Sequence, residues 1–63
     1  SLAQDYKTAV NLYTFRAEHG NAVPQYKLGI MYNFGFGVIE DYETSLKWHI
    51  LSAERERHLL INK

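Results

Sequence analysis

Residues 22–55 carry two helical patterns on either side of a glycine-containing turn, and they read AVPQYKLGIMYNFGFGVIEDYETSLKWHILSAER. The second pattern, which starts near Asp41, also occurs at the beginning of the chain. A shift of 36 positions, as from Asp5 to Asp41, brings identical residues together. Identical pairs include Asp5/Asp41, Tyr6/Tyr42, Thr8/Thr44, Ala17/Ala53 and Glu18/Glu54. A period of this length predicts helical hairpins that stack and bury their apolar faces on one another.

The same stretch resembles the Sel-1-like repeats, which are relatives of the tetratricopeptide repeats. The matching residues, in order and at the family's spacing, are Ala22, Gln25, Tyr26, Leu28, Gly29, Met31, Tyr32, Gly35, Gly37, Val38, Asp41, Tyr42, Trp48 and Ala53. Four residues depart from the family pattern. Alanine is usual at the positions of Pro24, Ser45 and Ser52, and tyrosine is usual at the position of His49.

The resemblance implies an all-α fold, an α/α solenoid of antiparallel helical hairpins with about one and a half repeats. Residues 1–63 are then a single repeat segment. Within it, 1–20 is the second helix of a preceding repeat, 21–55 is one full repeat, and 56–63 is a helical C-terminal extension.

The first helix is expected to follow Asp5, because a short acidic side chain caps the free N–H groups at a helix start. Leu2 corresponds to Val38 and is expected to pin the preceding turn to the core. An apolar stripe at helical spacing comprises Tyr6, Ala9, Val10, Leu12, Tyr13 and Ala17. The helix should end near His19, with Gly20 in the left-handed conformation that glycine adopts readily.

A middle helix is expected over residues 22–34, with Pro24 in its first turn, where a missing N–H costs no hydrogen bond. Its core face consists of Leu28, Met31 and Tyr32. Glycine inside a helix costs about 1 kcal/mol relative to alanine. We therefore expect Gly29 to lie against a neighbouring helix at a small residue, either Ala9 or Ser45.

The last helix is expected to begin at Asp41, after a turn at residues 35–37 that is interpreted as structural and not as a phosphate-binding loop. One stripe at helical spacing, apolar except for Arg57, comprises Tyr42, Leu46, Ile50, Ala53, Arg57 and Leu60. The repeat period predicts a Gly-Asn stop at positions 56 and 57, but Glu56 and Arg57 stand there. The helix should therefore continue beyond the repeat.

Charge and composition argue against several classes of partner. Seven Lys and Arg balance seven Asp and Glu, and this neutral balance indicates neither a nucleic-acid nor an anionic-membrane surface. No apolar run approaches the roughly 20 residues that span a bilayer, so no membrane insertion by this segment is expected. The compartment is left open. A chain of 63 residues without cysteine buries little surface, so we expect a fragment of a longer solenoid or an associating chain.

No catalytic residue, metal site or cofactor is predicted. His19, His49 and His58 lack the spacing of metal ligands, and Ser45 and Ser52 have no visible histidine–acid partners. A hydrolase is the enzymatic alternative, since some bacterial repeat proteins of the resembled family were proposed to be hydrolases. Those proteins are rich in cysteine, whereas this chain has none, which disfavours that alternative.

Two surfaces are candidate binding sites. The first is a partner-binding face on the middle helix, formed by Val23, Lys27, Ile30 and Phe34 at positions that the repeat pattern leaves free. In related solenoids the first helix of each pair lines the groove that binds partner segments. The alternative is that Ile30 and Phe34 pack against a neighbouring repeat.

The second surface is a set of apolar residues near the C-terminus, which we predict to mediate self-association. The set comprises Ile50, Leu51, Leu59, Leu60 and Ile61. It can dock on another subunit or on a later part of the parent chain. The alternative is a capping helix that folds back on the last hairpin.

The resemblance therefore implies a non-catalytic protein–protein interaction module, a scaffold or adaptor segment of a helical-repeat protein. The alternative within the binding class is a self-association or capping segment with its dimer contact in residues 46–61. Expected partners are other proteins, further copies of the chain or adjacent repeats, and not nucleic acid.

Overall fold

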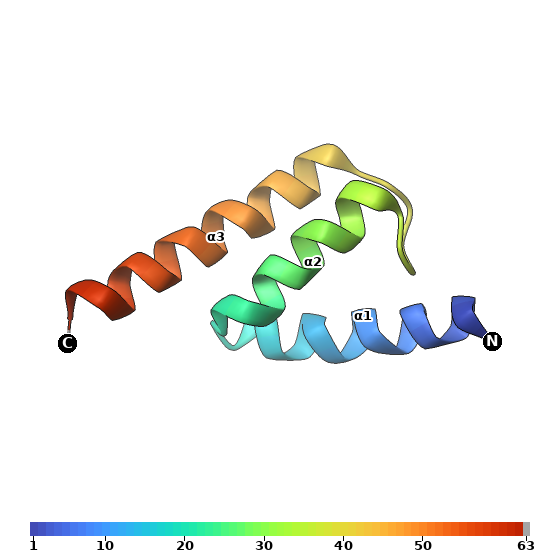
Figure 1. Ribbon diagram of the computed structural model, residues 1–63, viewed down its shortest axis with the longest axis horizontal. Coiled ribbons are helices and arrows are strands. Elements are labelled where there is room, and N and C mark those ends of the chain that lie inside the picture. Colours follow the sequence, from blue (N-terminus) through green and yellow to red (C-terminus); the bar gives the residue numbers. More distant parts are fainter. Residues whose placement is uncertain (63) are drawn as a thin grey trace.

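The computed structural model describes residues 1–62, which are all-helical without any strand (Figure 1). Three helices follow in chain order: α1 (Leu2–Glu18), α2 (Ala22–Phe34) and α3 (Tyr42–Ile61). The bounds of α2 are those predicted from the sequence. α3 continues past Arg55 without a break. The extension expected over 56–63 is helical as far as Ile61, and Lys63 lies outside the described residues.

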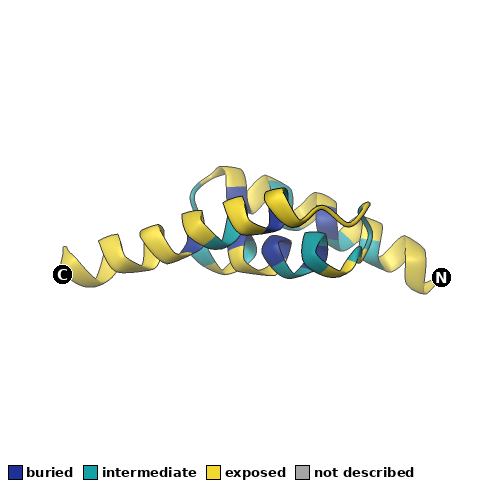
Figure 2. Ribbon diagram, turned by 90° about the horizontal axis from the view of Figure 1, so that it is seen from above, coloured by how far each residue is buried: buried dark blue, intermediate teal, exposed yellow. Residues whose placement is uncertain are grey.

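The three helices form one layer, with α2 between α1 and α3 (Figure 1). α2 packs against both neighbours, whereas α1 and α3 do not contact each other within residues 1–62. The layer measures 42 × 20 × 13 Å. Buried residues gather in its middle, and the start of α1 and the end of α3 are exposed (Figure 2). α1 and α3 therefore each have one side that no other helix covers.

The start of α1 differs from the prediction. Asp5 does not cap the helix, because α1 already begins at Leu2, and Ser1 Oγ accepts a hydrogen bond from the Gln4 N–H at 3.3 Å. Leu2 is 70% exposed and does not pin a turn to the core. Leucine, alanine and glutamine are good helix formers, so a serine N-cap allows the helix to begin before Asp5.

The hydrophobic core lies mainly between α1 and α2. Its buried members are Val10, Ala17, Leu28 and Met31, and the partly buried side chains packed around them are Tyr6, Ala9, Tyr13, Tyr32, Val38 and Trp48. The core faces predicted for α1 and α2 are thus confirmed, with one exception. Leu12 is 45% exposed. It follows Val10 by two positions, which places it about 200° around the helix and away from the core.

A buried glutamine joins α2 to the end of α1. Gln25 Nε2 donates a hydrogen bond to the Ala17 carbonyl at 3.1 Å. The last carbonyls of a helix lack intrahelical partners. The Ala17 carbonyl accepts hydrogen bonds from both the Gly20 N–H, at 2.9 Å, and the Gln25 side chain. α1 ends at Glu18 and Gly20 has φ +87°, as predicted for the turn that follows.

Small and polar side chains form the contact between α2 and α3. Ser45 Oγ donates a hydrogen bond to the Gly29 carbonyl at 2.5 Å, and Ser52 Oγ donates one to the Ala22 carbonyl at 2.8 Å. Both serines are buried, which confirms that they occupy small packing positions. The two serines are seven positions apart (45 to 52), as are the two carbonyls (22 to 29). The antiparallel helices are therefore joined at two points about two turns apart.

The ring of His49 leaves no room for a side chain at position 29. A Cβ atom at position 29 would lie 2.6 Å from His49 Cε1, which is closer than real Cβ contacts. The ring of Tyr26 packs edge-on against the same imidazole, with ring centroids 5.3 Å apart. The predicted contact of Gly29 with Ser45 is confirmed by their hydrogen bond. The neighbour that excludes a side chain at position 29, however, is a histidine and not a small residue.

The apolar stripe of the last helix lies on the side of α3 that α2 does not cover. Tyr42, Leu46 and Ile50 are all exposed. The α3 residues that are buried or half-buried in its first part are Thr44, Ser45, Trp48, His49 and Ser52. The side of α3 with the most regular spacing of apolar residues is therefore the side that α2 does not cover.

The turn between α2 and α3 contacts the start of α1. Gly35 ends α2 with φ +73°, and Gly37 has φ +74°. A Cβ atom at Gly37 would lie 2.7 Å from the backbone carbonyl carbon and oxygen of Tyr6. Gly37 is thus needed twice, for its backbone conformation and for the close approach of the turn to α1.

Asp41 caps α3, as predicted. Its Oδ1 accepts a hydrogen bond from the Thr44 N–H at 3.4 Å, and its Oδ2 accepts one from the Thr44 hydroxyl at 2.8 Å. These bonds, the hydroxyl bond first, hold the pKa of the Asp41 carboxyl below its ordinary value, because they stabilise the charged form.

We predict that Gly37→Ala is more destabilising than Gly20→Ala. Both glycines have positive φ, so alanine at either position costs about 1–2 kcal/mol. A methyl group at Gly20 meets nothing within 4 Å, whereas at Gly37 it meets the α1 backbone. Overpacking adds about 1–3 kcal/mol at Gly37. Urea unfolding of both variants measures the difference, and equal losses would contradict the close approach.

The effect of Gly29→Ala should depend on His49. In the wild-type background the new methyl group overlaps the imidazole, and we expect destabilisation of about 1–3 kcal/mol. A His49→Ala background removes the three atoms nearest to that methyl group, so alanine should there stabilise the helix by about 1 kcal/mol. A double-mutant cycle by thermal unfolding checks this reversal of sign. The same change in both backgrounds would show that the ring is not the constraint.

The Asp41 cap should give stability a pH dependence in acid. Because the folded-state pKa is lowered, the contribution is complete above the unfolded value of about 3.9 and is lost as pH falls through the folded pKa. Asp41→Asn keeps an acceptor but cannot titrate, so it should flatten this part of the profile. Thr44→Val, which lacks the hydroxyl donor, should reduce the slope. Urea unfolding between pH 6 and pH 2.5 measures all three chains, and identical slopes would disprove the assignment.

Candidate interaction surfaces

The predicted partner-binding residues lie on one side of α2, here called the α2 face. This face consists of Val23, Lys27, Ile30 and Phe34. Val23, Lys27 and Phe34 are exposed, and Ile30 is half-buried. Steps of four, three and four positions keep the four residues within about 60° of one another around the helix. The structure thus brings all four together on the same side of α2.

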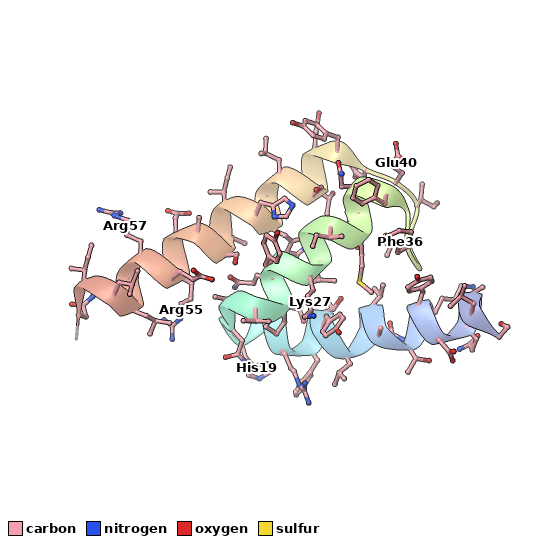
Figure 3. All side chains as sticks on the ribbon, viewed as in Figure 1. His19, Lys27, Phe36, Glu40, Arg55 and Arg57 are labelled. Carbon is pink, nitrogen blue, oxygen red and sulfur yellow. The ribbon has the colours of Figure 1, made fainter. Side chains whose placement is uncertain are left out.

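Aromatic rings on the neighbouring helices flank the α2 face. Lys27 Nζ lies 5.7 Å from the centroid of the Tyr13 ring on α1. This distance allows a cation–π attraction that orients the lysine (Figure 3). On the other side, Tyr26 packs against His49 of α3. The α2 face therefore continues onto both neighbouring helices.

A stack of three aromatic rings forms the end of the α2 face nearest the turn. Phe34 stacks on Phe36 with centroids 5.7 Å apart, and Phe36 stacks on Tyr6 of α1 at 5.1 Å. Such pairs contribute about 0.5–1.5 kcal/mol beyond the area they bury. Phe34 is exposed but is held in place by its neighbour. An ordered aromatic side chain loses less conformational entropy when it binds a partner.

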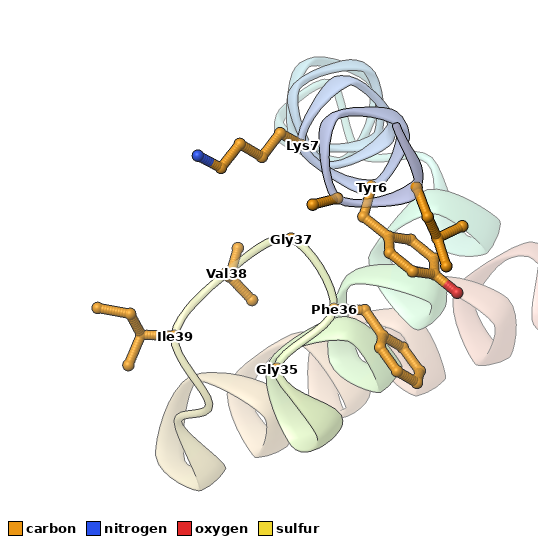
Figure 4. Close-up of a pocket in the computed structure, with 9 residues that line it drawn as sticks. Tyr6, Lys7, Gly35, Phe36, Gly37, Val38 and Ile39 are labelled. Carbon is orange, nitrogen blue, oxygen red and sulfur yellow. The ribbon is translucent and has the colours of Figure 1, made fainter.

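An apolar cleft of about 510 Å³, not predicted from the sequence, opens between α1 and the turn (Figure 4). Its lining consists of Leu2, Ala3, Tyr6, Lys7, Gly35, Phe36, Gly37, Val38 and Ile39. Ile39 is 90% exposed at its edge. The apolar pair Val38-Ile39 directly after the turn was the available sequence signal.

The residues predicted to self-associate are all exposed on α3, but they do not share one face. Ile50 and Ile61 are eleven positions apart (50 to 61), about three turns, and lie on the same side. Leu59 lies on the opposite side, where it borders a shallow hollow with Arg55 and the start of α2. Leu51 and Leu60 lie between these two directions, on opposite flanks. The set is therefore divided among several sides of the helix.

The free side of α3 holds a shallow hollow that includes part of this set. It is lined by Glu43, Leu46, Lys47, Ile50 and Leu51. Its lining combines the apolar side chains of Leu46, Ile50 and Leu51 with the charged side chains of Glu43 and Lys47.

The serine hydroxyls and the histidine ring at the contact of α2 and α3 make structural contacts. The hydroxyls of Ser45 and Ser52 donate to carbonyls of α2, and His49 packs on Gly29. Across residues 1–62 no group of three or more His, Cys, Asp or Glu residues is arranged to hold a metal ion. Over the same residues no helix is both long and apolar enough to cross a membrane.

Comparison with protein-family models, with curated proteins and with solved structures finds no match to this chain. What is established for residues 1–62 is an all-helical fold of three helices, with Val23, Lys27 and Phe34 exposed on α2.

Proposed function

We propose that this chain is a non-catalytic protein–protein interaction module, a scaffold or adaptor segment of a Sel-1-like, helical-repeat protein. In this proposal α1 is the second helix of one repeat, and α2 with α3 is the next hairpin of an α/α solenoid. The α2 face binds a segment of a partner protein.

The observation that supports the proposal most is the exposure of ordered apolar side chains on the α2 face. Val23 and Phe34 are each 60% exposed. Exposed apolar side chains that gather on one face of a protein often mark a binding site. The central helix of a layer also presents this patch together with side chains from both neighbours.

The chemistry of the face indicates the kind of partner. Val23, Ile30 and Phe34 supply apolar contacts, and Lys27 supplies one positive charge between them. An amphipathic helix with apolar side chains at i, i+3 and i+7 and an acidic residue beside them matches this arrangement. The acidic group would pair with Lys27.

The hydrogen bonds of the two buried serine hydroxyls also agree with a binding role. Nucleophilic catalysis requires a hydroxyl that is free to attack and is paired with a base. Ser45 and Ser52 instead donate their hydrogens to backbone carbonyls of α2. We therefore include in the proposal that the segment is not an enzyme and needs no cofactor.

Site-specific photo-crosslinking tests the α2 face. A photoreactive phenylalanine analogue is placed at Val23 or at Phe34, with exposed Asn11 of α1 as the control position. In cells that make the protein, we expect adducts with another protein from the first two positions and not from Asn11. Adding Lys27→Glu should reduce the adducts roughly fivefold or more, because it places like charges together.

The outcomes separate the alternatives. Adducts only between copies of the chain would favour the self-association alternative. If Val23 and Phe34 yield no more adducts than Asn11, the α2 face is not the binding site and the proposal fails.

A further inference from the structure

The outer face of α3, the side turned away from α2, is a second surface, distinct from the α2 face. It consists of Tyr42, Glu43, Leu46, Lys47, Ile50, Ala53, Glu54, Arg57 and Leu60, all of them exposed. Figure 3 shows Arg57 on the side of α3 away from α2. Tyr42 is 70%, Ile50 51% and Leu60 68% exposed. Burial of these side chains would stabilise an association by the hydrophobic effect.

The charges on the outer face have a symmetric order. Along α3 they are Glu43, Lys47, Glu54 and Arg57. The midpoint of Glu43 and Arg57 is position 50, from (43 + 57)/2, and the midpoint of Lys47 and Glu54 is 50.5, from (47 + 54)/2. Glu43 and Arg57 are thus each seven positions from Ile50, and Lys47 and Glu54 are three and four positions from it. An antiparallel copy of the same helix would present the complementary charge at each of these positions.

We propose that the outer face binds a second copy of this chain, with the two α3 helices antiparallel about a two-fold axis near Ile50. Glu43 then faces Arg57 of the second copy, and Lys47 faces Glu54 of the second copy. The symmetry makes each contact occur twice. A parallel pairing in register would place each charge against itself.

Apolar contacts agree with the same axis. Ile50 meets Ile50 of the second copy at the axis, and Tyr42 faces Leu60 of the second copy, because their midpoint, (42 + 60)/2, is position 51. In an antiparallel helix pair the two flanks of the contact differ. Here the ion pairs of Lys47 and Glu54 form one flank, and Tyr42 with Leu60 forms the other.

The shape of the molecule accommodates this pairing. α1 and α2 lie on the opposite side of α3 in a layer that is 13 Å thick. The second copy therefore extends the layer from three helices to six without contacting α1 or α2. The hollow at Leu46 and Ile50 can receive an apolar side chain of the second copy. The α2 faces of both copies remain open, so this inference does not depend on the proposed partner site.

A set of charge swaps tests the pairing. The first half-swap is Glu43→Lys with Lys47→Glu, and the second half-swap is Glu54→Arg with Arg57→Glu. Neither changes the composition or the net charge, and each keeps its opposite charges together within the helix. Each half-swap alone places like charges together in the dimer. The two half-swapped chains mixed, or all four substitutions in one chain, place opposite charges together again.

Sedimentation equilibrium of the 63-residue chain at low ionic strength measures the result. We expect the wild type to form a dimer and each half-swap to raise the dissociation constant roughly tenfold or more. The equimolar mixture and the four-substitution chain should recover the dimer. Circular dichroism of the same samples reports helicity, which should recover with mass if folding and association are coupled.

Three outcomes would overturn the inference. A wild-type chain that is monomeric at every concentration leaves no dimer to explain. Half-swaps that do not weaken the dimer would place its contact on another surface. A mixture that does not recover would show that the occupant is something other than an antiparallel copy.

If a half-swap fails to fold even in the mixture, Ile50→Asp decides the matter, because it places two carboxylates at the axis and should dissociate the dimer.

Discussion

The close approach of α2 and α3 at Gly29 determines which side chains of α3 pack against α2. Because position 29 carries no side chain, the His49 ring and the Ser45 hydroxyl reach the backbone of α2. Gly29, two serines and His49 make the polar part of this contact, and Trp48 is the large side chain of α3 that packs against the core. Tyr42, Leu46 and Ile50 are left exposed on the other side of α3.

α1 is attached to this hairpin by three kinds of contact. Apolar side chains pack between α1 and α2, Gln25 binds the Ala17 carbonyl near the end of α1, and Gly37 lies on the backbone of Tyr6 near its start. The attachment is thus distributed along the length of α1. The core itself is small, as expected for a chain of this size, and burial of the exposed faces by other proteins would add to stability.

The sequence predicted those parts of the fold that depend on local signals. Helix α2, the left-handed Gly20, the Asp41 cap and the core residue Leu28 follow from turn chemistry and helical spacing. The sequence did not reveal which side of α3 packs, because its apolar stripe through Leu46 and Ile50 has a stronger period than the small residues that face α2. Similarly, the His49–Gly29 contact depends on the distance between two helices, which no local pattern specifies. The α2 face was predicted as a set, but its flanking rings from Tyr13 and His49 belong to other helices.

The contact of Gly37 with Tyr6 has a consequence for the order in which the chain folds. Most of the packing joins helices that are neighbours in the sequence, and contacts of this kind form quickly, because the loops they close are short. Gly37 and Tyr6 are 31 positions apart (37 minus 6), so their contact closes a longer loop. It also requires the turn after α2 to have its final shape before α1 can lie against it. We therefore expect the α2–α3 hairpin to form first, and α1 to dock along its whole length once the turn at Gly37 is complete.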